Sequence, residues 1–294
     1  MKCFETTIKP LLKFGDGVAK ETGKKFKEFG CKKVLAGYDA NLPEAIVSTV
    51  LDSITAEGIE LIPYSCPYAD GQDTGVLEVR QLAIDNQVDG FLAMGGGSTM
   101  DIVKAASLLV DKPLPIDQYF VGWYNGPDLP RKAHLISIPT TSGTGAEATR
   151  SCIIASQTLG VKATLSSQAA KADFVFLDPQ ITKSLPPYVT ATTGMDAISH
   201  ACEALCCVKS NIFTEMICGK SLELSWANLY TAYKEPDNLE ARANMSMAAY
   251  LGLTGESYGN CGHSMAHAIG ARFHVPHGHC CAWTAPVALY FTRK

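Results

Sequence analysis

The chain has 294 residues, of which 47% are hydrophobic and 18% charged, and its formal net charge is -4. This length is sufficient for two domains with separate cores, and the composition is that of an ordinary globular enzyme. We expect no nucleic-acid partner, because the chain lacks the clustered Lys and Arg that bind a phosphate backbone. No apolar segment has the length of a signal sequence or a membrane span, so we expect a cytoplasmic protein with no membrane partner.

The eleven cysteines are scattered along the chain and are never spaced as CxxC. Two pairs are adjacent, Cys206 with Cys207 and Cys280 with Cys281. This pattern suits neither a disulfide framework nor a zinc ribbon. We therefore expect free, mostly buried thiols in a reducing compartment.

Short apolar runs alternate with amphipathic stretches in the first part of the chain. We expect strands at Val34–Ala36, Glu60–Ile62, Phe91–Met94, Leu135–Ile138 and Phe174–Leu177. The stretches between them predict helices at Glu44–Ala56, Val76–Asn86 and Met100–Leu109. Strands that alternate with helices indicate an α/β domain with a parallel sheet covered on both faces.

The pattern changes after Asp178-Pro179, where few β-branched runs remain. Segments with helical periodicity follow at Thr193–Cys207, Ile212–Tyr233 and Leu239–Leu253. We place the domain boundary near Ser184. Residues 1–184 are then a dinucleotide-binding α/β domain, and residues 185–294 an all-α, metal-binding domain.

A glycine-rich turn, Gly95–Thr99, directly follows the predicted strand Phe91–Met94 and precedes a helix. A turn of this kind presents backbone N–H groups and a helix N-terminus to an anion such as a pyrophosphate. Ser98 or Thr99 is expected to cap the helix. A glycine-rich turn between a strand and a helix can also be purely structural, so this motif alone does not establish a nucleotide site.

A second turn rich in hydroxyls and glycines, Pro139–Gly145, also follows a predicted strand. Two such turns at the carboxyl ends of parallel strands are typical of a ligand site. Asp39, the candidate for contact with a ribose, precedes the glycine turn, whereas in the standard dinucleotide fold the acid follows it. This order indicates a different connectivity, and the residues alone leave open that Asp39 is an ordinary loop aspartate.

Six of the seven histidines lie between residues 200 and 279, which suggests a metal site. Asp196 and His200 are four residues apart in a predicted helix, so their side chains share one face. His263 and His267 repeat this spacing, and the segment HVPHGH adds three histidines. A carboxylate with imidazoles suits Fe²⁺ or Zn²⁺ better than Ca²⁺ or Mg²⁺. A purely structural metal site remains an alternative.

Several motifs of the sequence resemble those of the iron-containing alcohol dehydrogenases, which have a dehydroquinate-synthase-like fold. The matching stretches between residues 14 and 278 are FGDGVAKETG, VLAGYDANL, DGFLAMGGGSTMDIVKAAS, SIPTTSGTGAEAT, DPQITKSLPPYVTATTGMDAISHACEA and GHSMAHAIGARFHVPHG. The last two carry specific signatures that are hard to obtain by chance.

The resemblance assigns a role to individual positions. The implied metal ligands are Asp196, His200, His263 and His277. His267 matches a histidine that lies near the nicotinamide and the substrate without binding metal. The implied cofactor residues are Gly96, Gly97, Ser98 and Asp101 at the pyrophosphate loop, Thr140, Thr141 and Thr144 at the second turn, Lys162 near the ribose, and Asp39 at the ribose 2′-hydroxyl.

The activity implied is reversible hydride transfer between NAD(H) and a primary alcohol or diol and its aldehyde. Fe²⁺, with Zn²⁺ as a possible substitute, would polarise the substrate oxygen, and we expect a homo-oligomer. One alternative is a zinc polyol dehydrogenase of the glycerol type on the same fold. Another is a shortened, non-catalytic relative that acts as a binding or oligomer partner.

Two segments depart from the family pattern and leave the substrate open: LCCVKSNIFTE after the Asp196 helix and ESYGNC before His263. The sequence also ends at TAPVALYFTRK, where the family continues through further helices, so we expect a truncated helical domain. The apolar faces of the helices between Thr190 and Leu253 would then be exposed. We expect either a second chain that covers them or weak activity with a loosely packed second domain.

Overall fold

The computed structural model describes residues 10–122, 124–254 and 261–292. It divides into two compact units. Among the described residues, the sheet unit comprises residues 10–140 together with Thr149–Asp178, and the helical unit comprises Thr141–Ala148 and the residues from Pro179 onward. The second turn predicted from the sequence is therefore shared, because Thr140 belongs to one unit and Thr141 to the other.

The sheet unit is built on six parallel strands in the order β1-β8-β5-β4-β2-β3. They are β1 (Leu11–Phe14), β2 (Lys33–Asp39), β3 (Glu60–Cys66), β4 (Gly90–Gly95), β5 (His134–Pro139) and β8 (Phe174–Leu177). All five predicted strands and the parallel sheet are confirmed. Strand β1 was not predicted, because its apolar residues form only a short stretch interrupted by Lys13.

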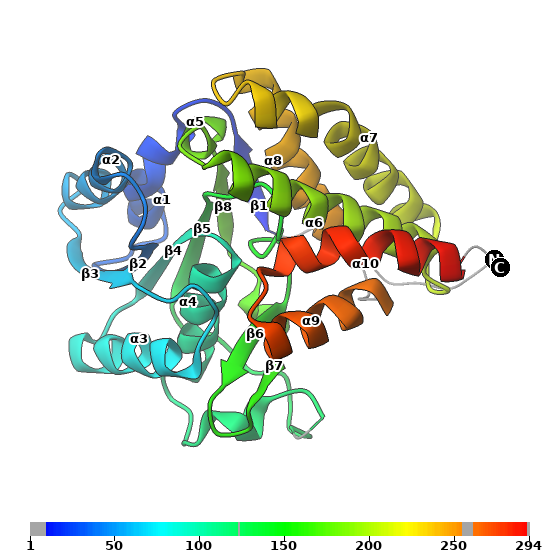
Figure 1. Ribbon diagram of the computed structural model, residues 1–294. Helices are drawn as coiled ribbons and strands as arrows, with labels where there is room; N and C mark the ends of the chain where they lie inside the picture. The colour runs from blue at the N-terminus through cyan, green and yellow to red at the C-terminus, as the bar shows by residue number, and fades with distance from the viewer. Residues whose placement is uncertain (1–9, 123, 255–260, 293–294) are drawn as a thin grey trace. The chain divides into compact units, whose positions relative to one another are not determined.

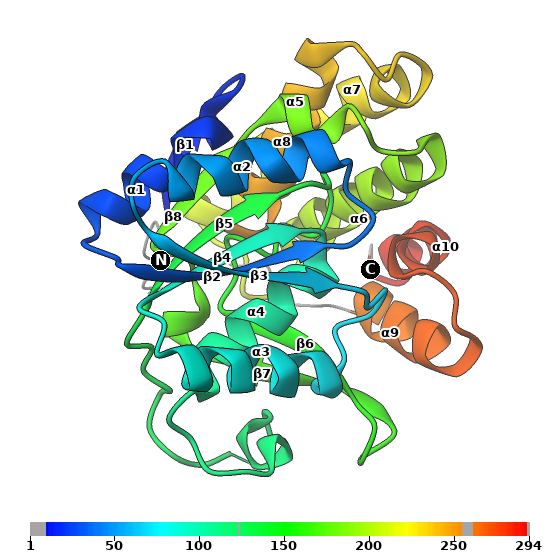
Figure 2. The ribbon, with the colours of Figure 1, turned by 90° about the vertical axis from the view of Figure 1, so that its left-hand side faces the viewer.

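Helices cover both faces of this sheet, as the sequence predicts. Figure 2 shows α1 (Thr22–Glu28) and α2 (Glu44–Thr55) over one face, and α3 (Asp73–Asn86) and α4 (Gly97–Leu109) over the other. Strand β4 is buried along its whole length, and α4 is buried from Thr99 onward. The glycine turn between them is therefore held by the most deeply buried pair of elements in this unit. Short 3-10 helices lie at Val18–Glu21, Ile116–Tyr119 and Gln168–Ala170.

An antiparallel hairpin of β6 (Ser151–Ser156) and β7 (Val161–Ser166) forms a separate two-stranded sheet. The sequence did not predict it. The chain reverses at Gly160, whose φ of 66° lies in the left-handed region that favours glycine. The hairpin replaces the helix that a standard strand–turn–helix repeat would place after β5.

The helical unit contains α5 (Pro179–Thr182), α6 (Pro187–Cys206), α7 (Ile212–Lys234), α8 (Leu239–Thr254), α9 (Cys261–Phe273) and α10 (His277–Thr292). Helix α6 packs against α7, α8 and α10, and α10 also packs against α9 (Figure 1). The three helices predicted in this part of the chain are confirmed, and so is the α/β-then-α fold class. Among the described helices, none has the length and apolar character needed to cross a membrane.

Candidate metal centre and cofactor turns

Helix α6 supplies one side of a buried polar cluster. Asp196 is 2% exposed, and His200 lies one turn further along the same face. The Nδ1 atom of His200 is 3.6 Å from Oδ1 of Asp196. The spacing of four residues therefore brings the two side chains together as the sequence predicts.

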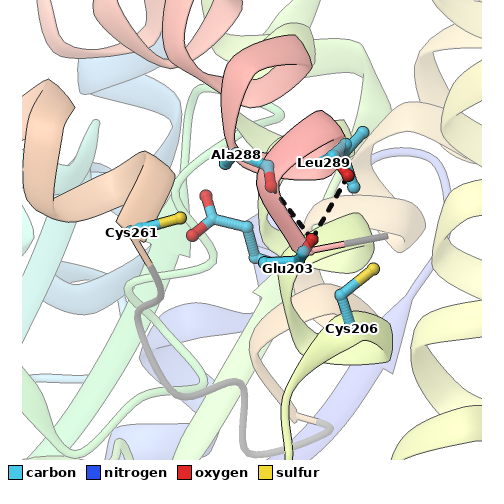
Figure 3. Close-up of a pocket in the computed structure, with 6 residues that line it drawn as sticks. Glu203, Cys206, Cys261, Ala288 and Leu289 are labelled. Atoms are coloured by element: carbon cyan, nitrogen blue, oxygen red, sulfur yellow. Dashed lines mark hydrogen bonds between the residues drawn. The ribbon is translucent and has the colours of Figure 1, made fainter. Parts of the chain in front are cut away.

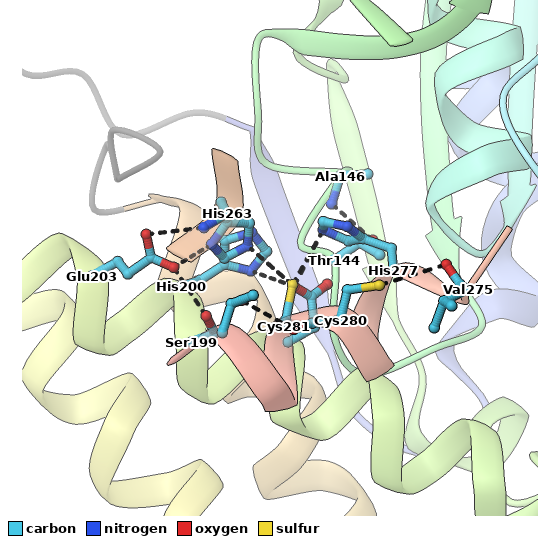
Figure 4. Close-up of polar contacts among 12 residues, drawn as sticks. Thr144, Ala146, Ser199, His200, Glu203, His263, Val275, His277, Cys280 and Cys281 are labelled. Carbon is cyan, nitrogen blue, oxygen red and sulfur yellow. Dashed lines mark hydrogen bonds and ion pairs between the residues drawn. The ribbon is translucent and has the colours of Figure 1, made fainter. Parts of the chain in front are cut away.

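Helices α9 and α10 complete this cluster from the other side (Figure 4). The Nε2 atom of His263 lies 3.2 Å from Oδ1 of Asp196, and the Nε2 atom of His277 lies 3.7 Å from it. The thiol of Cys281 is 3.5 Å from His277 Nε2 and 3.8 Å from His263 Nε2. One donor atom each from Asp196, His263, His277 and Cys281 lie within 4.8 Å of one another. We call these four residues together with His200 the metal cluster.

Glu203 supports the metal cluster from α6, two turns after Asp196. Its Oε1 atom lies 2.6 Å from Nδ1 of His263 and accepts a hydrogen bond from the Ser199 hydroxyl. Its Oε2 atom accepts from the backbone N–H of His263 at 3.3 Å. A carboxylate on one ring nitrogen of a histidine fixes the ring so that the other nitrogen faces a ligand position. Here that other nitrogen is Nε2, which faces Asp196.

Two glycines allow the three helices to approach this closely. A Cβ atom at Gly278 would lie 2.3 Å from the carbonyl oxygen of Thr192 in α6. A Cβ atom at Gly262 would lie 2.6 Å from Oε1 of Glu203. Glycine at these positions therefore permits the close contacts that bring His277 and His263 to Asp196.

The charges of the metal cluster favour a bound cation. Burial alone would raise the pKa of Asp196, but His200, His277 and His263 hold it below its ordinary value. Burial alone would lower the pKa of His263, but hydrogen bonding to Asp196, Cys281 and Glu203 raises it to about 12. Burial lowers the pKa of His200 to about 3. A proton on His263 therefore balances the two carboxylates, and a bound cation would take the place of this proton, while His200 is neutral with a lone pair to donate.

The donors fit a transition metal. Among the described residues, Nδ1 of His200 is a buried polar atom without a hydrogen-bond partner, as expected of a nitrogen whose natural partner is a metal ion. Imidazoles with one carboxylate are typical ligands of Fe²⁺ and Zn²⁺. The sequence interpretation missed Cys281, although it lies four residues after His277 and so on the same helical face.

The other histidines of this region differ in position. His267 lies one turn after His263 in α9, and its ring centre is 4.8 Å from that of His277. It therefore lies beside the metal cluster, as expected of a residue near the substrate. His279 instead contacts Tyr188 and Trp283, with its Nδ1 2.8 Å from the tyrosine hydroxyl oxygen. His274 is exposed, so within HVPHGH only His277 joins the cluster.

A small pocket lies behind Glu203 where α6, α9 and α10 meet (Figure 3). It is lined by Glu203, Cys206, Cys261, Ala288, Leu289 and Thr292. The pocket is too narrow to admit a substrate. It is a packing defect behind the carboxylate that orients His263, not a binding site.

The glycine turn of the sheet unit has the predicted position, between β4 and α4, but not the predicted cap. Gly96 is the N-cap residue and no side chain caps the helix. The expectation that Ser98 or Thr99 caps α4 is wrong, because the helix starts at Gly97 and both residues already lie in its first turn. The Ser98 hydroxyl instead donates to the carbonyl oxygen of Ala69 at 2.8 Å.

Three predicted cofactor residues of the sheet unit have polar partners within that unit. Asp101 is buried, lies 3.3 Å from the ammonium of Lys104 and accepts from the N–H of Ile153 at 2.9 Å, while burial raises its pKa. Lys162 donates to Asp70 at 2.7 Å. Asp39 is the last residue of β2, and its Oδ1 atom accepts two hydrogen bonds from Asn41.

The threonines of the second turn follow β5 directly. Thr140 is buried and its N–H donates to the carbonyl oxygen of Gly95, which ties this turn to the glycine turn. The Thr141 hydroxyl is a buried group without a hydrogen-bond partner in the described part of the chain. The Thr144 hydroxyl accepts from the N–H of Ala146 at 3.4 Å.

The two segments that depart from the family pattern lie at the ends of helices. The segment LCCVKSNIFTE spans the end of α6 and the first turn of α7, where the Asn211 side chain caps α7. The segment ESYGNC lies outside the described residues except for Cys261.

Comparison with known proteins gives one consistent result over both units. The family model described as iron-containing alcohol dehydrogenase matches residues 10–179, and the model of the C-terminal domain of the Fe-containing alcohol dehydrogenase family matches residues 190–294. The sulfoacetaldehyde reductase of Bilophila wadsworthia is 34% identical over 97% of this chain and 73% of its own length.

Solved structures agree with these matches. An alcohol dehydrogenase from Oenococcus oeni has a TM-score of 0.91 and 29% identity, over 98% of this chain and 76% of that one. A sulfoacetaldehyde reductase from Bifidobacterium kashiwanohense, solved in complex with NAD⁺, has a TM-score of 0.88 and 26% identity, over 99% of this chain and 76% of that one. The chain belongs to the iron-containing alcohol dehydrogenase family. The predicted class, an NAD-linked, metal-dependent alcohol dehydrogenase, is confirmed.

Proposed function

We propose that the chain interconverts a small primary alcohol or diol and its aldehyde by hydride transfer with NAD(H), at a divalent cation held by Asp196, His200, His263 and His277. The observation that carries this assignment is the convergence of these side chains from α6, α9 and α10. The cation is Fe²⁺ or Zn²⁺. When bound, it supplies Lewis-acid polarisation of the substrate oxygen.

The residues around the cation orient its ligands and transfer protons during the reaction. Glu203 holds His263 by its Nδ1 atom, so that Nε2 stays directed at Asp196. His267 is the group that exchanges the alcohol proton with solvent, because an imidazole can both accept and donate a proton and this one adjoins His277. The proposed reaction needs no covalent nucleophile, because the hydride passes directly between the substrate carbon and the nicotinamide.

The cofactor residues follow from the resemblance and from their positions in the chain. The pyrophosphate is bound at the N-terminus of α4 by Gly96, Gly97 and Ser98, with Asp101 supporting this turn through its contacts with Lys104 and Ile153. The ribose and nicotinamide are bound by Asp39, Lys162, Thr140, Thr141 and Thr144. Two of the similar proteins are named sulfoacetaldehyde reductases, and these names favour a short aldehyde with a polar end as substrate.

The test is NADH oxidation by anaerobically purified protein with a panel of short aldehydes that includes sulfoacetaldehyde. Activity should be absent from chelator-treated protein and should return on addition of Fe²⁺ or Zn²⁺. Protein that is fully loaded with metal, binds NADH and turns over none of the aldehydes would overturn the proposal.

Four further properties are part of the proposal. The domains divide near Ser184, between the ranges matched by the two family models. The protein is cytoplasmic, acts on small molecules, and assembles as a homo-oligomer. Large apolar side chains support the last point: on α7, Trp226 is 76% exposed and Tyr230 is 72% exposed, and on α10 Phe291 is 74% exposed. Sedimentation of the full chain tests the assembly, and a monomer at micromolar concentration would exclude it.

A further inference from the structure

Two adjacent cysteines at the start of α10 have different surroundings (Figure 4). Both side chains are fully buried. The thiol of Cys280 points away from the metal cluster and donates to the carbonyl oxygen of Val275 at 3.7 Å. The thiol of Cys281 points into the cluster, beside Nε2 of both His263 and His277. Neighbouring residues on a helix point in different directions, so the fold selects one of the two thiols for the cluster.

The distances around Cys281 are those of a four-donor metal shell. Metal–nitrogen bonds of 2.0–2.1 Å and a metal–sulfur bond of about 2.3 Å, set at tetrahedral angles, separate sulfur from nitrogen by roughly 3.6 Å. The observed separations from Cys281 are 3.5 and 3.8 Å. The same bond lengths separate a carboxylate oxygen from nitrogen by about 3.4 Å, and the separations from Asp196 are 3.2 and 3.7 Å.

We propose that the thiolate of Cys281 binds the cation directly, together with Asp196, His263 and His277. This inference rests on the metal centre proposed above and adds a ligand that neither the sequence interpretation nor the resemblance includes. On coordination the S–H bond is replaced by a sulfur–metal bond and the proton leaves to solvent. In this four-donor shell Cys281 takes the place given above to His200, whose Nδ1 atom stays 3.6 Å from Oδ1 of Asp196.

A thiolate ligand has a consequence for metal choice. Soft sulfur donors favour Zn²⁺ and Co²⁺ over hard cations such as Mg²⁺ and Mn²⁺, and Zn²⁺ exceeds Fe²⁺ in the general order of affinities. The chain should therefore bind Zn²⁺ more tightly than Fe²⁺. Loss of the sulfur should reduce the ratio of the Zn²⁺ affinity to the Fe²⁺ affinity.

The experiment uses Co²⁺ as a spectroscopic probe in the full chain. Sulfur-to-cobalt charge transfer gives an intense near-ultraviolet band that imidazole and carboxylate ligands do not give. The wild-type protein and the matched control Cys280→Ser should both show the band. Cys281→Ser should lack it, retain the weaker visible bands of bound Co²⁺, and bind Zn²⁺ at least tenfold more weakly in competition with a chelator.

A second measurement needs no variant and so does not depend on how well Cys281→Ser folds. X-ray absorption at the zinc edge of the wild-type protein should contain one sulfur at about 2.3 Å. A shell of nitrogen and oxygen alone, or a charge-transfer band that persists in Cys281→Ser, overturns the thiolate ligand and leaves the proposed function intact. Failure of the wild-type protein to bind Co²⁺ or Zn²⁺ overturns both.

Discussion

In the helical unit the residues predicted to bind metal meet at one buried point, whereas in the sheet unit several residues predicted to bind cofactor are engaged by their own neighbours. Asp196 lies among three histidines and a thiol, and Nδ1 of His200 is buried with no hydrogen-bond partner among the described residues. Asp101 and Lys162, in contrast, have a lysine and an aspartate beside them. Several ionisable side chains buried close together have lost their hydration, which costs free energy, and such a cluster indicates a bound ligand. A charged side chain paired with an oppositely charged neighbour gives no such indication.

This difference separates assignments that rest on the structure alone from assignments that rest on the family. The metal centre is recognisable from its own geometry and charge, without reference to any relative. The cofactor turns have the right backbone, with a helix N-terminus at Gly97 and backbone N–H groups at its start, but many sheets carry such turns. The role of the side chains in the sheet unit therefore depends on the family, and the predictions below test the two kinds of assignment.

The largest effect is expected for His277→Ala. Loss of one ligand opens the shell, so metal content and dehydrogenase activity should fall essentially to background, beyond the roughly 10–100-fold loss caused by removal of an outer partner. The matched control is His279→Ala, two residues along the same helix, which removes only the contacts with Tyr188 and Trp283. Elemental analysis and NADH oxidation measure both. A fully metallated His277 variant would show that the ligand assignment is wrong.

The next effect concerns Glu203, which touches His263 rather than the cation. Glu203→Ala should weaken zinc binding by roughly 10–100-fold, because the His263 ring loses the group that orients it. Glu203→Gln should lose less, since its amide oxygen can still accept from Nδ1 of His263. Chelator competition gives the three affinities. Equal zinc affinity in the wild-type and Glu203→Ala proteins would mean that packing alone orients His263.

The third prediction compares two helical glycines in the metal-free protein. Gly278→Ala places a methyl group 2.3 Å from the Thr192 carbonyl oxygen, so the free energy of unfolding should fall by about 1–3 kcal/mol. Gly219→Ala in α7 meets no atom within 4 Å and should raise it by about 0.5–1 kcal/mol, because alanine favours the helix. Urea denaturation followed by circular dichroism measures both. Stabilisation of equal size in the two variants would contradict the close approach of α10 to α6.

Much of the fold could be predicted from the sequence, because the periodicity of hydrophobic residues and the local composition indicate which residues are buried. The strand Phe91–Met94 is an apolar run that becomes the fully buried β4. Strand β1 is only four residues long and Lys13 interrupts its apolar residues, so its signal is weaker. The hairpin of β6 and β7 has the alternating burial of a half-buried strand, but its residues include serines, a lysine and a threonine and form no continuous apolar run, so the sequence interpretation missed it.

The metal site was predictable to the extent that its ligands share a helix. Asp196 and His200 are one turn apart, so their proximity follows from helix geometry. The meeting of α6 with α9 and α10 depends on close packing at Gly262 and Gly278, which no local pattern reveals. Cys281 was missed for a related reason: a cysteine in an apolar stretch is usually a packing residue, and only the tertiary position of His277 distinguishes it from Cys280.

The smallest expected effect concerns Asp39, and it tests whether the sheet unit carries cofactor specificity at the end of β2. The carboxylate is held in place by the backbone N–H and side-chain amide of Asn41, both on Oδ1. A carboxylate at this position accepts hydrogen bonds from a free ribose 2′-hydroxyl and repels a 2′-phosphate, so the wild-type protein should prefer NADH over NADPH. Asp39→Gly should reduce the ratio of kcat/KM with NADH to kcat/KM with NADPH by about tenfold, which corresponds to about 1.4 kcal/mol.

Asn41→Ala is the matched control, because it leaves the charge of Asp39 and removes one of the two hydrogen bonds that hold it. It should change the ratio much less. Metal content should stay at the wild-type level in both variants, since Asp39 takes no part in the metal cluster. Equal use of the two cofactors by the wild-type protein would remove Asp39 from the site, and would leave the assignment of the metal centre unchanged, because that assignment depends on none of the same residues.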